Sequence, residues 1–92
     1  MFEIIEEVPA PDPNRVAEID AALAEVRAEL LRAIAKFPPF NSAHEGYAVL
    51  AEEVDELWDD VKRDFAQGQR AEAVQVAAMA VRFVTDLGGK SA

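Results

Sequence analysis

The chain has 92 residues, 51% of them hydrophobic, and contains no cysteine. Its 18 acidic residues outnumber its 9 lysines and arginines, which gives a net charge of −9. This length allows one domain, the absence of cysteine excludes disulfides and thiolate chemistry, and the negative charge argues against nucleic acid or anionic lipid as a partner.

The N-terminal segment, residues 1–11, is predicted to be an extended arm. Its prolines exclude a helix, and it carries four apolar residues: Phe2, Ile4, Ile5 and Val8. It has several glutamates and no long apolar run, so it resembles neither a signal peptide nor a membrane span. We therefore expect a cytoplasmic protein with no membrane partner.

A helical domain is predicted over residues 12–87. Its first helix begins after Asp12 as N-cap, with Pro13 in the first turn, and ends at Pro38-Pro39. Apolar residues recur every three or four positions, close to a heptad pattern, so this helix should pack lengthwise against other helices. They are Val16, Ile19, Leu23, Val26, Leu30, Ile34 and Phe37.

Two further helices are expected. Ser42 and Glu45 form a capping box that begins a helix running to Phe65 or Ala66, before Gly68 breaks the chain. The third helix is predicted from Arg70 to Leu87, with residues 88–92 as a loose tail. It is apolar on two sides, which is typical of a central helix. The sequence thus predicts an all-α fold: a small antiparallel bundle of three main helices that completes a four-helix-type core by oligomerisation.

Six carboxylates crowd into residues 51–60, AEEVDELWDD. Most fit a solvated helix face, but Glu53 leans toward the packed side. Glu53 and Glu56 lie one turn apart, and Glu72 and Gln75 repeat that spacing on the next helix. If the two helices pack antiparallel, the pairs can face each other, and oxygen ligands without cysteine suit Mg²⁺ or Mn²⁺.

The segments HEGYAVLAEEVDELWDDV and EAVQVAAMAVRFVTDL resemble the all-α nucleotide pyrophosphatase superfamily, the MazG-like proteins. That family carries EExxE on one helix and ExxD on the next. Glu52, Glu53 and Glu56 match the first motif and Glu72 begins the second. Gln75 stands where the family has its aspartate, which removes one charge from the motif.

The resemblance implies a Mg²⁺-dependent hydrolase, with Mn²⁺ as a possible substitute, that cleaves nucleoside triphosphates to monophosphate and pyrophosphate. Glu53, Glu56 and Glu72 would be metal ligands, and Gln75 could offer its carbonyl oxygen. Glu52 would be a ligand or the base that orients the attacking water. Dimers or tetramers are implied as well, so a homo-oligomer is expected.

Three other residues are candidate substrate contacts. Arg82 pairs with Asp86 one turn on or contacts a phosphate. His44 serves a surface or capping role or contacts phosphate, and Tyr47 packs or borders a nucleotide pocket.

Two alternatives to the enzyme stay open. One is a catalytically degenerate MazG-like helical module for nucleotide sensing or protein interaction. The other is a plain structural bundle with an acidic exterior.

Overall fold

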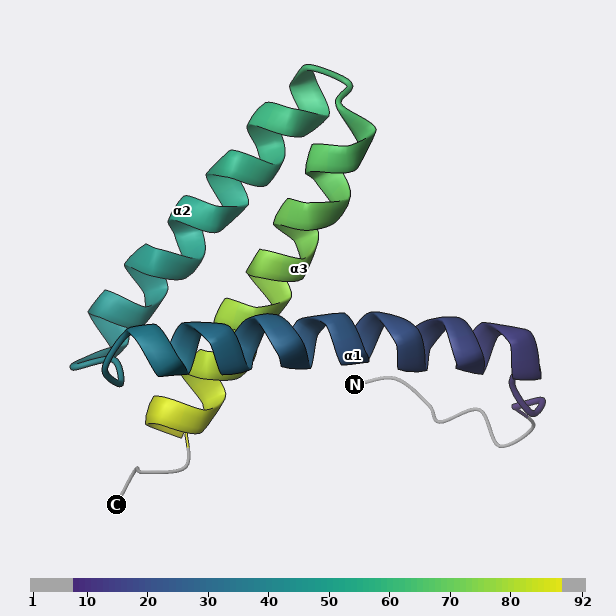
Figure 1. Ribbon diagram of the computed structural model, residues 1–92, viewed down its shortest axis with the longest axis horizontal. Helices are drawn as coiled ribbons and strands as arrows, with labels where there is room; N and C mark the ends of the chain where they lie inside the picture. The colour runs from purple at the N-terminus through teal and green to yellow at the C-terminus, as the bar shows by residue number, and fades with distance from the viewer. Residues whose placement is uncertain (1–7, 89–92) are drawn as a thin grey trace.

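The computed structural model describes residues 8–88, and these contain helices and no strand. The elements are α1 (Pro13–Lys36), α2 (Ala43–Lys62), α3 (Ala66–Phe83) and a short π-helix, η1 (Val84–Gly88) (Figure 1). The all-α class with three main helices is confirmed. Residues 1–7 of the predicted arm and 89–92 of the predicted tail lie outside the described residues.

Both predicted N-caps are present. The Asp12 side chain accepts the Asn14 amide at 2.9 Å, and Pro13 occupies the first turn of α1. Ser42 Oγ accepts the Glu45 amide at 3.1 Å. Glu45 Oε1 accepts the amide of Asn41 at 2.6 Å, so the carboxylate reaches one residue beyond the N-cap. The bonds to the Asn14 and Glu45 amides satisfy donors that the first helical turn leaves unpaired.

The turn between α2 and α3 differs from the prediction. α2 ends at Lys62, and α3 begins at Ala66, four residues earlier than expected. Asp64 makes the reversal with a φ of 58°, so the left-handed residue is not the glycine. Gly68 lies inside α3, where a Cβ would come within 2.5 Å of Asp60 Oδ2. Gly68 therefore permits a close helix approach and does not break the chain.

α2 and α3 form an antiparallel hairpin, and α1 crosses it over the C-terminal part of α3 (Figure 1). The core at this crossing is small. Its buried members are Ala33, Ala78 and Met79, and four partly buried residues pack against them: Val26, Leu30, Val49 and Leu50. The third helix thus contributes to the core, as its two apolar sides predicted.

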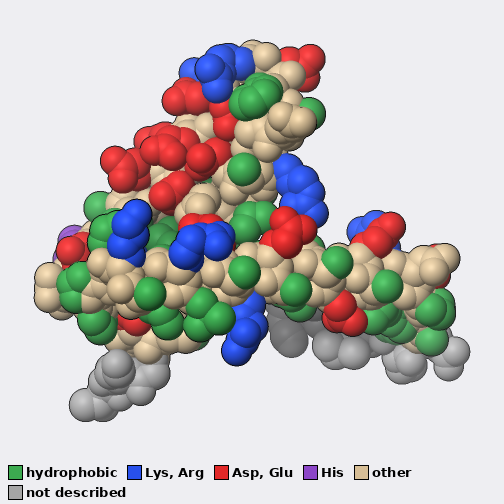
Figure 2. Space-filling model, viewed as in Figure 1, with side chains coloured by type: hydrophobic (Ala, Val, Ile, Leu, Met, Phe, Trp, Pro, Cys, Tyr) green, Lys and Arg blue, Asp and Glu red, His purple; other side chains and the backbone are tan. Residues whose placement is uncertain are grey.

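Much of the predicted apolar surface is not buried. Only the C-terminal half of α1 packs on the hairpin, and Figure 2 shows hydrophobic side chains along α1 at the surface. On the expected apolar side of α2, Leu50 and Leu57 are partly buried while four residues are exposed: Tyr47, Val54, Val61 and Phe65. Within residues 8–88, no helix combines the length and hydropathy needed to cross a membrane.

Candidate metal centre

Three glutamates from the hairpin converge. Glu53 and Glu56 lie one turn apart on α2, and Glu72 lies in the second turn of α3. The antiparallel arrangement brings one carboxylate oxygen from each to within 4.8 Å of the others. We call these residues the acid cluster. These are three of the four residues that the spacing of the two motifs predicted to face each other, and the fourth is Gln75.

The members of the acid cluster differ in exposure. Glu53 and Glu72 are half-buried, whereas Glu56 is exposed. Glu72 Oε2 is itself buried and accepts no hydrogen bond from any residue of the described chain. Its near neighbour is the carboxyl group of Glu53. Ionised carboxylates only accept hydrogen bonds. The carboxyl groups of Glu53 and Glu72 are therefore stabilised at this short distance only if they share a proton or bind a cation.

Partial removal from water raises the pKa of all three carboxyl groups, and the negative charge of Glu72 also raises the pKa of the exposed Glu56. Hydrogen bonding from a protonated Glu72 carboxyl group lowers the pKa of Glu53, whereas the negative charges of Glu56, Glu52 and Glu29 raise it further. Two full charges about 5 Å apart repel by roughly 3 kcal/mol at an effective dielectric near 20, and by less where solvent screens them. The cluster is therefore unfavourable when fully ionised and alone.

The donor set suits a hard divalent cation. Three carboxylate oxygens on two rigid helices match the preference of Mg²⁺ and Mn²⁺ for oxygen ligands. Mg²⁺ held by few carboxylates keeps several waters and commonly binds substrate phosphates as well. The residues present therefore fit such an ion, and the unsatisfied oxygen of Glu72 is where it would relieve a buried charge.

Gln75 lies one turn after Glu72, but it interacts with α1. Hydrogen bonding from Arg32 lowers the pKa of Glu29, and hydrogen bonding from Gln75 lowers it to a smaller extent. The carboxylate of Glu29 also forms an ion pair with Arg32. Gln75 thus takes part in a polar contact between α1 and α3, outside the trio of converging carboxylates.

A hollow of about 570 Å³ opens between α1, the α1–α2 linker and the hairpin. We call it the main hollow. Acidic side chains line one part of its wall: Glu29, Glu45, Glu52 and Glu53. Cationic side chains from α1 and α3 line another: Arg32, Lys36 and Arg82. Its size is within the range of small-molecule sites.

The acid cluster also borders a second hollow of about 490 Å³ beside the α2–α3 turn. Glu56 and Glu72 line it, together with Lys62 and Arg63. Glu53 faces the main hollow, so the cluster is reached from two sides.

Glu29 and Arg32 were not singled out from the sequence, although they line the main hollow. Both lie on α1, outside the two motif segments. Glu29 falls four residues before the buried Ala33, and that spacing on an apolar helix was the available signal.

His44 and Tyr47 lie apart from the acid cluster. They line a separate apolar hollow of about 510 Å³ with Leu50 and Phe83. Tyr47 is 68% exposed, so it does not pack into the core of the single chain. Neither residue lines the main hollow.

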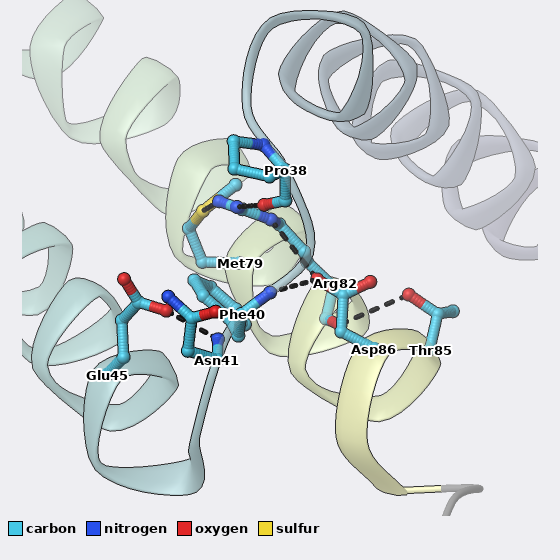
Figure 3. A network of polar contacts seen from close by, with 8 residues as sticks. All are labelled: Pro38, Phe40, Asn41, Glu45, Met79, Arg82, Thr85 and Asp86. Carbon is cyan, nitrogen blue, oxygen red and sulfur yellow. Dashed lines mark hydrogen bonds and ion pairs between the residues drawn. The ribbon is translucent and has the colours of Figure 1, made fainter.

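Arg82 is buried at the base of the main hollow and belongs to a polar network (Figure 3). Its Nη2 donates to Pro38 O at 2.8 Å, and its Nε lies 3.5 Å from Asp86 Oδ2. The ion pair with Asp86 that the sequence suggested is therefore present. Asp86 in turn accepts the amide of Phe40 at 3.0 Å, so the network fixes the α1–α2 linker on α3.

No protein-family model matches the chain, and no significant match is found among curated proteins or solved structures.

Proposed function

We propose that this protein is a Mg²⁺-dependent nucleoside triphosphate pyrophosphohydrolase that cleaves (d)NTP to (d)NMP and pyrophosphate. The observation that carries the proposal is the convergence of Glu53, Glu56 and Glu72 within 4.8 Å. The resemblance of the two motif segments to MazG-like enzymes supports the same reaction.

Different residues of the chain would have different roles in the reaction. Glu53, Glu56 and Glu72 would hold the ion from two helices, so that its position is fixed by the hairpin. Bound there, Mg²⁺ supplies Lewis-acid polarisation of the phosphate and lowers the pKa of a coordinated water. Glu52 is exposed on the rim of the main hollow, where a carboxylate can accept a proton from water.

The rest of the main hollow would bind the substrate. Arg32 and Lys36 lie on its wall and can neutralise phosphate charge that the acidic chain otherwise repels. Arg82 also lines the hollow, but one of its guanidinium nitrogens donates to Pro38 O in the linker. Its proposed role is to shape the hollow and add positive charge. His44 and Tyr47 would contact the substrate only if it extends to the separate apolar hollow.

A catalytically degenerate helical module is the second candidate. It is favoured by Gln75, which supplies no charge and lies beside Glu29 of α1. Such a module would sense nucleotides or bind a protein through the same hollow without turnover. A homo-oligomer, dimer or tetramer, located in the cytoplasm, is part of both proposals.

Pyrophosphate release from common ribo- and deoxyribonucleotides, with Mg²⁺ or Mn²⁺, tests the enzyme. We expect turnover by the natural sequence and none by Glu53→Gln. Glu18→Gln is the matched control, because it removes one charge from an exposed position of α1. Titration with Mn²⁺ alone should show weaker binding for Glu53→Gln only.

The outcomes separate the candidates. Nucleotide binding without turnover supports the sensing module. If the natural sequence binds neither Mn²⁺ nor nucleotide, both proposals are wrong.

A further inference from the structure

The N-terminal half of α1 buries no residue within the described chain, although Glu25 at its end forms an ion pair with Arg70 of α3 at 2.6 Å. Every residue from 8 to 25 is exposed, whereas Val26, Leu30 and Ala33 pack in the core. The free half carries large apolar side chains: Leu23 is 59% exposed and Ile19 is 50% exposed. Figure 1 shows this half of α1 extending beyond the hairpin.

This projection makes the single chain unusually extended. Its radius of gyration is 16.0 Å, whereas a compact chain of this length has about 12 Å. A projecting helix segment must hold its shape by intrinsic propensity alone, and such short segments are marginal in water. An extended shape with apolar side chains in solvent indicates that another surface covers α1.

The uncovered apolar residues form a stripe along the whole helix. At about 100° per residue, Val16, Leu23 and Ile34 point within about 20° of one another. This direction is roughly 65° around the helix from the one that Val26, Leu30 and Ala33 direct into the core. We call the uncovered set the outer stripe: Val16, Ile19, Leu23, Leu31 and Ile34, which are between 37% and 59% exposed. A partner can therefore cover it without disturbing the core.

Charge along α1 favours one orientation of a second copy. Residues 13–25 hold three acids and one arginine, and of these acids Glu25 already pairs with Arg70. Residues 26–36 hold three cations and one acid, Glu29, which pairs with Arg32. Antiparallel pairing sets each half against its opposite, whereas parallel pairing sets like charges together. The helix dipoles also favour the antiparallel arrangement.

We infer that two copies of this chain pair through their outer stripes, with the α1 helices antiparallel about a twofold axis near the middle of α1. The interface is isologous, because the same stripe serves both copies. This inference specifies the partner surface of the proposed homo-oligomer and does not depend on the proposed enzymatic activity.

The pairing leaves the main hollow open. At about 100° per residue, Arg32 and Lys36 point roughly 160° away from the direction of the outer stripe. They therefore line the hollow on the side of α1 that faces away from the partner.

The mass in solution is the first test. We expect two chains of 10.1 kDa, or four if a second interface also forms, for the natural sequence in sedimentation equilibrium. Ile19→Glu combined with Leu23→Glu should at least halve that mass. Ala17→Glu combined with Ala21→Glu is the matched control, because it adds two glutamates at the same spacing on the other side of α1. Circular dichroism checks that both variants stay helical.

Cysteine cross-linking tests the orientation in a chain that has no cysteine. In an antiparallel pair centred near residues 24–25, Leu23→Cys lies in the outer stripe, and its two copies are only about 6 Å apart by helix rise, so it should form a disulfide-linked dimer on oxidation. Val16→Cys should not, because its two copies lie about 27 Å apart by helix rise and a disulfide needs Cα atoms within about 7 Å. A mixture of Val16→Cys and Ile34→Cys should cross-link instead.

Three results would overturn the inference. One is a single-chain mass for the natural sequence. The outer stripe would then be covered by residues 1–7 or by a different protein. Another is a mass that Ile19→Glu with Leu23→Glu leaves unchanged. The third is self-cross-linking of Val16→Cys, which requires parallel helices.

Discussion

The guanidinium of Arg82 lies 3.9 Å from the ring centroid of Phe40. The two residues come from different parts of the fold: Arg82 from the end of α3, and Phe40 from the linker between α1 and α2. Phe40 is one of the few buried large apolar residues in residues 8–88, and Asp86 accepts its backbone amide. This stacked pair, together with the ion pair between Arg82 and Asp86, holds the α1–α2 linker against the end of α3.

Loss of the guanidinium should therefore destabilise the whole fold. We expect Arg82→Leu to lower the free energy of unfolding by about 3 kcal/mol, since it removes the cation that faces Asp86 and the donor to Pro38 O. Arg82→Lys should lower the free energy of unfolding by nearly as much, because an ammonium group cannot stack on Phe40 while it reaches the oxygens of Pro38 and Asp86. Urea denaturation measures both, and a loss under about 1 kcal/mol for Leu would contradict the role.

Gly46 should not tolerate a side chain. It is buried in α2, and a Cβ there would lie 2.7 Å from Phe83 Cδ2 and 3.1 Å from Phe40 Cδ2. Overpacking costs about 1–3 kcal/mol, while alanine gains about 1 kcal/mol of helix propensity over glycine. We expect Gly46→Ala to destabilise by about 1 kcal/mol net, with thermal unfolding as the measurement.

The clash is tested by making room for it. In the Phe83→Leu background, Gly46→Ala should become neutral or stabilising, because the nearer of the two rings is gone. Equal costs in both backgrounds would show that the ring of Phe83 does not restrict Gly46.

The acid cluster should make the metal-free protein less stable as pH rises. The pKa of Glu72 is raised in the fold, so the native state keeps its proton where the unfolded chain has lost it. That contribution is complete at low pH and is lost as pH rises through the raised pKa. Glu72→Gln should match the natural sequence below about pH 4 and exceed it near pH 7.5, by less than about 1 kcal/mol after solvent screening.

Mg²⁺ should remove that difference at neutral pH. At ten times its dissociation constant, an ion that binds only the folded state stabilises by about 1.4 kcal/mol. We expect a thermal shift of this origin for the natural sequence and little for Glu72→Gln. The same shift in both proteins would place the ion elsewhere.

The contact between Glu29 and Gln75 should behave as a pair. Gln75→Glu sets a second carboxylate against Glu29, which should destabilise by about 0.5 kcal/mol. Exchanging the two residues, Glu29→Gln with Gln75→Glu, restores an amide facing a carboxylate and should recover most of the loss. Urea midpoints of the four proteins give the coupling, and additivity would show that the side chains do not meet.

The same variants report on the metal. If Gln75→Glu tightens Mn²⁺ binding, position 75 lies within reach of the ion. If binding is unchanged, Gln75 acts only between α1 and α3.

The sequence by itself determined the local features of this protein. Capping at Asp12 and Ser42, the Pro38-Pro39 stop and the apolar periodicities involve residues a few positions apart, so backbone geometry alone relates them. The same periodicity, with antiparallel helices, predicted that Glu53, Glu56 and Glu72 lie close together, but it placed Gln75 with them, whereas Gln75 lies beside Glu29.

Tertiary structure decided what depends on contacts between distant segments. The α2–α3 turn was misplaced because the left-handed residue is Asp64, while Gly68 is required by its approach to Asp60. The stacking of Arg82 on Phe40 and the contact of Gln75 with Glu29 each join residues about 40 positions apart. No local pattern encodes such pairs, because their energy arises only when packing brings two helices together and excludes water between them.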